Sequence, residues 1–180
     1  MSIKRLAIIS MLLAAAIVIN YLESFIPVFI PGVKLGLANV IILIMLYEFK
    51  WHEALVVDIL RILIVSLIRG SFLTPAFYMS ITGGILSFII MLIFSKLKFF
   101  SPIGVSVLGA LAHSTGQVIA CIIIISLESV IYYLPFIALL SVLTGVLSGI
   151  IVRLYLKRSI TNKIIGDEKI WKRKYLYFCF

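Results

Sequence analysis

Long apolar runs constrain this chain more than any other feature of its sequence. Six runs stand out, at residues 6–26, 35–49, 54–68, 75–94, 101–126 and 131–156. A helix of about 20 apolar residues matches the hydrocarbon thickness of a bilayer. Hydrophobic residues make up 63% of the 180 residues and charged residues 13%, a composition too apolar for a soluble fold of this size to bury. We therefore expect an all-α membrane protein built as a bundle of six transmembrane helices.

Proline and glycine mark the boundaries of several runs. Pro27 and the Pro31-Gly32 pair end the first run, because proline lacks the N–H that continues a helix. Thr74-Pro75 and Ser101-Pro102 open the fourth and fifth runs, each with a capping residue followed by proline at the first helical position. The second run has fewer residues than a full crossing needs. Either the crossing is thin at this point, or the helix extends into the neighbouring loop.

Most of the 16 Lys and Arg residues flank the runs on one side of the predicted membrane. They lie before the first run, between the second and third, between the fourth and fifth, and after the sixth. Cytoplasmic loops of membrane proteins carry an excess of Lys and Arg. We therefore expect a multi-pass protein of the bacterial cell membrane with both termini in the cytoplasm.

The chain divides into two parts after the sixth run. Residues 1–158 are expected to form the six-helix transmembrane domain, and residues 159–180 form a basic tail with several aromatic residues. Such a tail suits the anionic headgroup layer of the inner leaflet, so membrane lipid is one expected partner. A solvated segment that helps to set the topology is the simpler alternative.

Two opposite charges lie close together in the third run. Asp58 and Arg61 are three residues apart and so share a helix face. An ionisable side chain in hydrocarbon costs roughly 3 kcal/mol on insertion scales and therefore needs a reason. One reason is an ion pair that neutralises both residues. The other is that Asp58 steadies Arg61, whose planar fork then holds an anionic group of a ligand.

His113 and Gln117 lie one helical turn apart in the fifth run, with Gly109 one turn before them. Their side chains offer hydrogen-bond donors and acceptors to a polar solute, and Gly109 is expected to leave space below them. A helix-to-helix hydrogen bond is the plainer interpretation of a lone membrane histidine. Together with Arg61, they are predicted to line an outward-opening substrate pocket beneath residues 27–34, with further polar residues expected in the outer half of the membrane: Asn39, Tyr78, Glu23 and Lys34.

Several classes of chemistry do not fit this sequence. Its aspartates are Asp58 and Asp167, so an aspartate-rich magnesium-diphosphate motif cannot be built. It has no glycine-rich phosphate loop, no HExxH motif and no serine-hydrolase elbow, and His52 and His113 are too few for a metal site. The basic residues form no stripe through a polar domain, which argues against nucleic-acid binding. We expect a non-catalytic chain without a cofactor or a metal.

Small residues at four-residue spacing predict close helix contacts, because helices in lipid associate where their backbones can approach each other. The sixth run carries Ser141, Gly145 and Gly149 in this register. In the first run Ser10 and Ala14 have the same spacing. They indicate either packing within the bundle or a docking face for another membrane subunit.

Several of these segments resemble a known family. Residues 31–39, with the sequence PGVKLGLAN, are similar to the signature that follows the first span of the Gx transporter family, which is also labelled heptaprenyl diphosphate synthase component I. The segment from Gly109 to Gln117, the Gly83-Gly84 pair and Arg61 fit the same family. The resemblance covers about residues 6–156.

This family is similar to the substrate-binding S components of energy-coupling factor transporters. The resemblance implies a six-helix S-component fold and uptake of a small solute of the vitamin or precursor type. It also implies docking, with Ser10 and Ala14 as the nearest match to the usual motif, onto a coupling transmembrane subunit with two ATPases.

The second family label leaves an alternative open. In it the chain is a membrane-anchoring component of a heptaprenyl diphosphate synthase system, non-catalytic by itself, whose partner is a prenyl synthase subunit. A solitary facilitator that works without ATP is a third interpretation.

Overall fold

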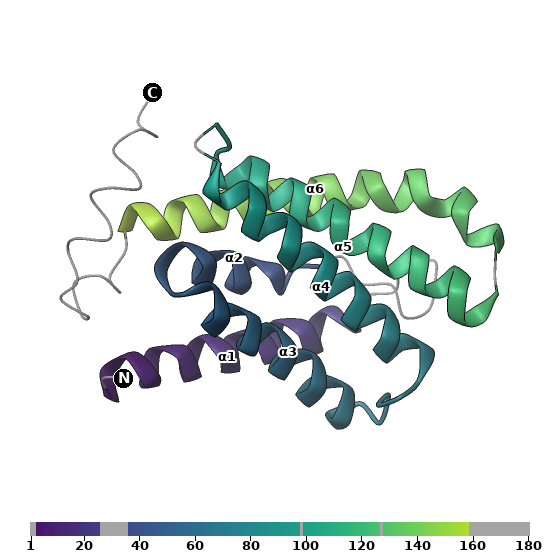
Figure 1. Ribbon diagram of the computed structural model, residues 1–180, viewed down its shortest axis with the longest axis horizontal. Coiled ribbons are helices and arrows are strands. Elements are labelled where there is room, and N and C mark those ends of the chain that lie inside the picture. The colour runs from purple at the N-terminus through teal and green to yellow at the C-terminus, as the bar shows by residue number, and fades with distance from the viewer. Residues whose placement is uncertain (1–2, 26–35, 98, 127, 159–180) are drawn as a thin grey trace.

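The computed structural model describes residues 3–25, 36–97, 99–126 and 128–158, and all regular structure within these ranges is helical (Figure 1). The prediction of an all-helical fold is confirmed for these ranges, which contain six α-helices. The helices are α1 (Ile3–Glu23), α2 (Asn39–Glu48), α3 (Trp51–Ile68), α4 (Pro75–Lys96), α5 (Pro102–Ile125) and α6 (Leu134–Arg158), and a 3-10 helix, η1 (Glu128–Tyr133), precedes α6.

Two helices begin where the sequence predicts. Pro75 and Pro102 occupy the first turns of α4 and α5, where the missing proline N–H has no helical partner to lose. The Ser101 side chain accepts a hydrogen bond from the Gly104 N–H at 3.2 Å and so caps α5.

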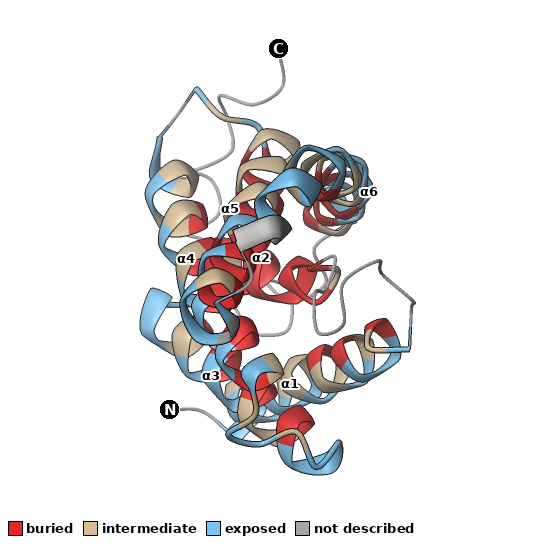
Figure 2. Cartoon of the chain, turned by 90° about the vertical axis from the view of Figure 1, so that its right-hand side faces the viewer, coloured by how far each residue is buried: buried red, intermediate tan, exposed pale blue. Residues whose placement is uncertain are grey.

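Four helices are long and apolar enough to cross a membrane, namely α1, α4, α5 and α6. The described part of the chain is therefore that of a multi-pass membrane protein, while the full count of six spans stays a prediction. Exposed apolar side chains cover the outer faces of the bundle, and buried positions lie on the inner faces (Figure 2). Such exposed apolar surface is what contact with lipid requires.

Helix α3 carries its charges inward. Asp58 and Arg61 are buried, whereas the exposed side of the helix presents Val56, Ile59 and Leu67. This distribution is the reverse of that on a soluble surface helix, and it is typical of a helix whose outer side faces lipid and whose ionisable residues face the bundle interior.

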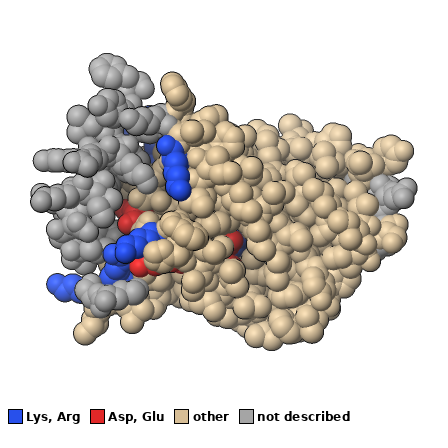
Figure 3. Space-filling model, viewed as in Figure 1, with Lys and Arg blue, Asp and Glu red and all other residues tan. Residues whose placement is uncertain are grey.

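Helix α1 begins and α6 ends at the same end of the bundle, where the α2–α3 corner also lies (Figure 1). Cationic side chains concentrate at this end, and most of the remaining described surface in the same view is uncharged (Figure 3). Ile3 and Arg158, the outermost described residues of α1 and α6, thus lie toward the same end of the bundle, and the cytoplasmic location of the termini stays a prediction. The predicted tail, residues 159–180, lies outside the described residues.

Helices α4, α5 and α6 pack closely through small residues. A Cβ on Gly116 of α5 would lie 2.9 Å from the Gly83 Cα of α4, and one on Gly149 of α6 would lie 2.5 Å from the Ile103 Cα of α5. Gly145 approaches the Val107 Cα in the same way. The predicted stripe on the sixth segment therefore forms a helix contact inside the bundle.

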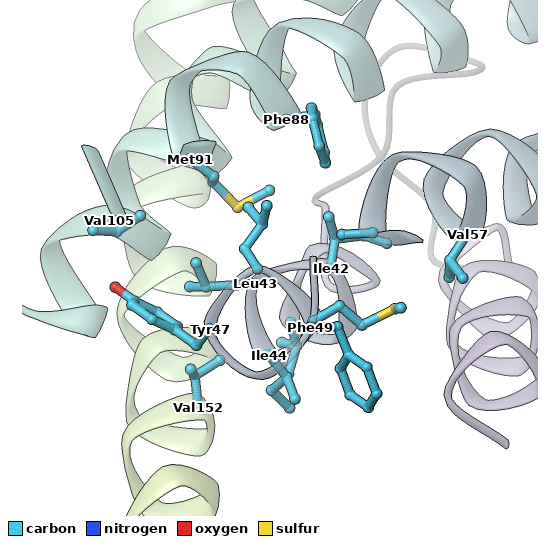
Figure 4. Packing of buried hydrophobic residues seen from close by; sticks show 14 of the residues in the cluster. Ile42, Leu43, Ile44, Tyr47, Phe49, Val57, Phe88, Met91, Val105 and Val152 are labelled. Atoms are coloured by element: carbon cyan, nitrogen blue, oxygen red, sulfur yellow. The ribbon is translucent and has the colours of Figure 1, made fainter. Parts of the chain in front are cut away.

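Helix α2 lies at the centre of the molecule, although it has only 10 residues. At about 1.5 Å per residue it is roughly 15 Å long, half the thickness of the hydrocarbon core. All its residues except Glu48 are buried. They pack against side chains from four other helices, among them Val57, Phe88, Met91, Val105 and Val152 (Figure 4). The second apolar run is therefore a short central helix whose start lies inside the protein.

Candidate functional site

A cluster of polar side chains lies where α2 begins, inside the bundle. Five helices contribute to it, and each of its side chains is at most 6% exposed. Its members are Glu23 of α1, Asn39 of α2, Asp58 and Arg61 of α3, Ser87 of α4, and His113 and Gln117 of α5. We call this group the polar cluster.

Arg61 is the centre of one half of the cluster. Its Nε donates to the Asp58 Oδ1 at 2.7 Å, and its Nη2 donates to the Asn39 Oδ1 at 2.8 Å. The Asn39 amide nitrogen in turn donates to the Ser87 hydroxyl at 3.0 Å. The guanidinium group thus joins α3 to α2, and the Asn39 amide joins α2 to α4. The ion pair that was one of two interpretations of Asp58 and Arg61 is present, and Asn39 extends it.

Glu23 holds the start of α2. Its Oε1 accepts hydrogen bonds from the backbone N–H groups of Gly36 and Leu37, the latter at 3.2 Å. The first N–H groups of a helix have no partner within it, and within a membrane protein they must be satisfied by other protein groups. The Glu23 carboxylate does this for the turn that leads into α2. It was predicted as a substrate ligand, and the structure gives it a structural contact.

Gly36 brings the two halves of the cluster together. Its φ of +81° lies in the left-handed region, and a Cβ there would be 3.1 Å from the Asn39 Nδ2 and 3.3 Å from the His113 ring. On the other side of the ring, a Cβ on Gly83 would lie 2.8 Å from the His113 backbone oxygen. The imidazole of His113 therefore fits between two glycines, and its Nε2 lies 2.9 Å from the Gln117 Nε2.

One prediction about this region is wrong. Gly109 was expected to leave space below His113 and Gln117, but the Met91 side chain of α4 fills that space. A Cβ on Gly109 would lie 2.5 Å from the Met91 Cγ. The glycine serves close packing of α4 against α5, because methionine is flexible enough to fill an irregular gap.

The structure unites five of the predicted substrate residues: Glu23, Asn39, Arg61, His113 and Gln117. It does not bring in Tyr78, which is 41% exposed and packs its ring on Phe77. Lys34 and the predicted cover at residues 27–34 lie outside the described residues. Whether the polar cluster binds a solute stays a prediction.

Two members of the site were not predicted from the sequence. Ser87 and Gly36 complete the contacts around Asn39, and neither has a spacing that singles it out among other serines and glycines. A polar Asn39 directly before an apolar run, three residues after Gly36, is the signal that could have indicated a helix start.

A second candidate site lies on the surface at the end of the bundle where α1 begins and α6 ends (Figure 1). We call it the basic end, and its described cations are Lys4, Arg5, Lys50, Lys96, Arg153, Lys157 and Arg158. Most are exposed, and Arg5 is partly buried. They come from the first turn of α1, the α2–α3 corner, the last turn of α4 and the last two turns of α6, so the fold gathers cations that are far apart in the sequence.

Two carboxylates at the basic end are already engaged. Glu53 forms an ion pair with Arg5 at 2.8 Å and accepts from the Lys50 backbone N–H at 2.9 Å. Glu48 accepts from the Tyr155 hydroxyl at 3.2 Å. These contacts fix the α2–α3 corner to α1 and α6 and leave the other cations of the surface in excess.

The electrostatics of Glu53 follow from these contacts. Partial burial alone would raise the pKa of its carboxyl group, but the hydrogen bonds from Arg5 and the Lys50 N–H, together with the nearby positive charges, outweigh it and lower the pKa. Glu53 thus stays ionised and keeps its bond to Arg5 at neutral pH.

The remaining predicted features can be placed briefly. Ser10 and Ala14 both lie on the exposed side of α1, where a partner helix would reach them, and their docking role stays a prediction. Within the described ranges, no three His, Cys, Asp or Glu side chains gather closely enough to hold a metal ion.

Comparison with known proteins gives one match. The family model described as heptaprenyl diphosphate synthase component I matches residues 12–155, which include α2 to α5 entirely and most of α1 and α6. Neither the curated proteins nor the solved structures contain a significant match to this chain.

Proposed function

This chain belongs to the heptaprenyl diphosphate synthase component I family, and we propose that it is the membrane component that holds a prenyl diphosphate synthase at the bilayer. In this proposal the chain itself is non-catalytic. The basic end faces the cytoplasm, where the partner synthase docks on it.

The observation that carries the proposal is the basic end. Seven described cations gather there, and both nearby carboxylates, Glu48 and Glu53, are held by other side chains. A surface with one sign of charge attracts a partner of the opposite sign and speeds their encounter. By the positive-inside rule, such an excess of cations favours a cytoplasmic location for this end, which is where a soluble synthase is available.

The sequence supports a non-catalytic role. Mg²⁺ that binds a diphosphate is usually held by carboxylate oxygens, and the aspartates of this chain are Asp58 and Asp167. Asp58 lies inside the bundle and its carboxylate is held by Arg61. Prenyl transfer would therefore take place on the partner.

Co-purification tests this proposal. The tagged chain, extracted from its native membranes in mild detergent, is expected to bring with it a prenyl diphosphate synthase, identified by mass spectrometry and by its activity. Replacing Lys4, Lys50 and Lys96 by Gln should reduce the recovered synthase at least tenfold, and raised salt should act likewise. Arg69→Gln, at the opposite end of α3, is the control and should leave recovery unchanged. Equal recovery with the triple variant would contradict the proposal.

The polar cluster favours a second candidate function, uptake of a small polar solute. Buried ionisable groups within a membrane bundle are costly and commonly mark a substrate pathway. In this alternative the chain captures the solute, and a coupling subunit with two ATPases docks on Ser10 and Ala14. Co-purified ATPases that are lost in a Ser10→Leu, Ala14→Leu variant would favour it, and their absence would count against it.

A further inference from the structure

We infer that the C-terminal end of α6 is a binding site for a long-chain prenyl diphosphate, with the diphosphate on Arg153, Lys157 and Arg158 and the isoprenoid tail along the outer side of the helix. The inference rests on the proposed function, because it names the lipid that the membrane component would receive from its partner. It assigns the cations of α6 a different role from those of α1, α3 and α4.

The three cations form a compact group. Arg153 and Lys157 are four residues apart on α6 and so lie on neighbouring turns of one face, and Arg158 follows directly. All three are exposed. The sequence of α6 contains no Asp or Glu, and the ion pairs among the described residues are Arg5–Glu53 and Arg61–Asp58. The three cations therefore repel one another, and binding of a multivalent anion would relieve this repulsion.

The helix dipole does not account for the whole group. Cations stabilise a helix C-terminus within its last turn, where Lys157 and Arg158 lie. Arg153 lies five residues before the end of α6 and is outside that turn. Its guanidinium fork is suited to binding two phosphate oxygens at once.

An apolar stripe leads directly to these cations. Its residues follow each other at intervals of four, three and four positions, and the next step of three reaches Lys157. They are between 41% and 59% exposed, and they are Leu143, Leu147, Ile150 and Leu154. From Leu143 to Lys157 the stripe is about 21 Å long at 1.5 Å per residue. A linear apolar chain with an anionic head at one end matches this shape.

Charge favours a diphosphate over an ordinary phospholipid. A phosphodiester headgroup carries a single negative charge, whereas a diphosphate monoester carries more than one and offers more oxygens to the three cations. Arg153 and Lys157 can each bind a different phosphate group. The site is therefore expected to prefer prenyl diphosphates to anionic phospholipids.

Native mass spectrometry of the purified full-length chain tests this inference. The probes are heptaprenyl diphosphate, heptaprenol, which lacks the charged head, and phosphatidylglycerol, which has a single phosphate. The variant replaces Arg153, Lys157 and Arg158 by Gln. Its matched control replaces Lys4, Lys50 and Lys96 by Gln and removes the same charge from the same end of the molecule.

We expect heptaprenyl diphosphate to bind at least tenfold more tightly than either other probe. The α6 variant should lose at least tenfold of this affinity and the control less than twofold, with both variants unfolding at the wild-type temperature. Equal losses in both variants, or equal binding of phosphatidylglycerol, would overturn the inference. No synthase is present in this experiment, so its result is independent of the co-purification test. Lipid binding at α6 could therefore be refuted while synthase docking is confirmed, and synthase docking could be refuted while lipid binding is confirmed.

Discussion

At the scale of single residues, Asp58 and Arg61 form a fully buried ion pair. Removing one partner of a buried pair leaves an uncompensated charge and typically costs about 3–5 kcal/mol. Asp58→Asn should therefore destabilise the protein strongly, because Arg61 is also buried and keeps its charge. The paired change Asp58→Leu with Arg61→Met should cost less than Asp58→Asn alone, since no charge is left inside.

Thermal unfolding of the detergent-solubilised variants measures both effects. The comparison between single and double variants separates the charge from the loss of shape. If the single variant unfolded at the wild-type temperature, Arg61 would have to be hydrated, and the polar cluster would be open to water.

Gly36 gives a second prediction with an internal control. Gly36→Ala should be strained by its φ of +81° and crowded against Asn39 and His113. Gly70 has a φ of +63° but nothing within 4 Å of the position of a Cβ. The left-handed conformation costs an alanine roughly 1–2 kcal/mol at either site. Unfolding measurements should therefore show a larger loss for Gly36→Ala, and equal losses would mean that the contacts around Gly36 are loose.

The third residue prediction concerns Glu53 and pH. Its pKa in the folded protein is lowered below the ordinary value of 4.5, so folding favours the ionised carboxylate. The stability that it contributes is complete above pH 4.5 and is lost as the pH falls through the lowered pKa. Glu53→Gln should lower the free energy of unfolding at pH 7 by an amount typical of a partly exposed ion pair, about 0.2–1 kcal/mol. The unfolding temperature should fall accordingly.

As the pH falls through the lowered pKa, the same substitution should have less and less effect, because the wild-type carboxyl becomes protonated too. Unfolding curves of both proteins over this pH range test the sign. A difference that grows toward acid pH would contradict the assigned ion pair between Arg5 and Glu53.

At the scale of helices, the contact between α4 and α5 depends on backbone approach at Gly83. A Cβ there would lie 2.8 Å from the backbone oxygen of His113, which cannot move without moving α5. Gly83→Ala is therefore expected to be destabilising. Gly104→Ala, in the first turn of α5, meets nothing closer than 3.5 Å and should be neutral or stabilising by about 0.5–1 kcal/mol. Equal unfolding temperatures for the two variants would contradict the close contact.

The helices also show what the sequence could predict. The starts of α4 and α5 follow from the proline and capping signals, which act locally. The true extent of α2 does not, because its start at Asn39 depends on a carboxylate from α1 that caps the turn at Gly36. The space near Gly109 was predicted wrongly because Met91, which fills it, belongs to another helix.

At the scale of the whole molecule, the sequence predicted the membrane class, the six helices and most of the polar cluster. Depth along the helices was enough to bring Glu23, Asn39 and Gln117 together, because antiparallel helices place residues of equal depth side by side. It could not predict that Tyr78 faces outward, since that depends on helix rotation. The likeness to S components of energy-coupling factor transporters remains a prediction, as does the full number of spans.

Charged side chains are arranged differently inside and outside the bundle. Inside the bundle, charges are paired and serve to join helices, as Arg61 does for α2 and α3. Outside it, the described cations gather mainly at one end (Figure 3). The first arrangement stabilises the fold, and the second provides the surface on which the proposed function depends.

The distribution of prenyl synthase activity in fractionated cells tests that function most directly. Cells with the wild-type chain should hold the activity in the membrane pellet. Cells that lack the chain, or that carry the Lys4, Lys50 and Lys96 to Gln variant, should release most of it into the soluble fraction. Activity that stays in the same fraction whether or not the chain is present would contradict the account.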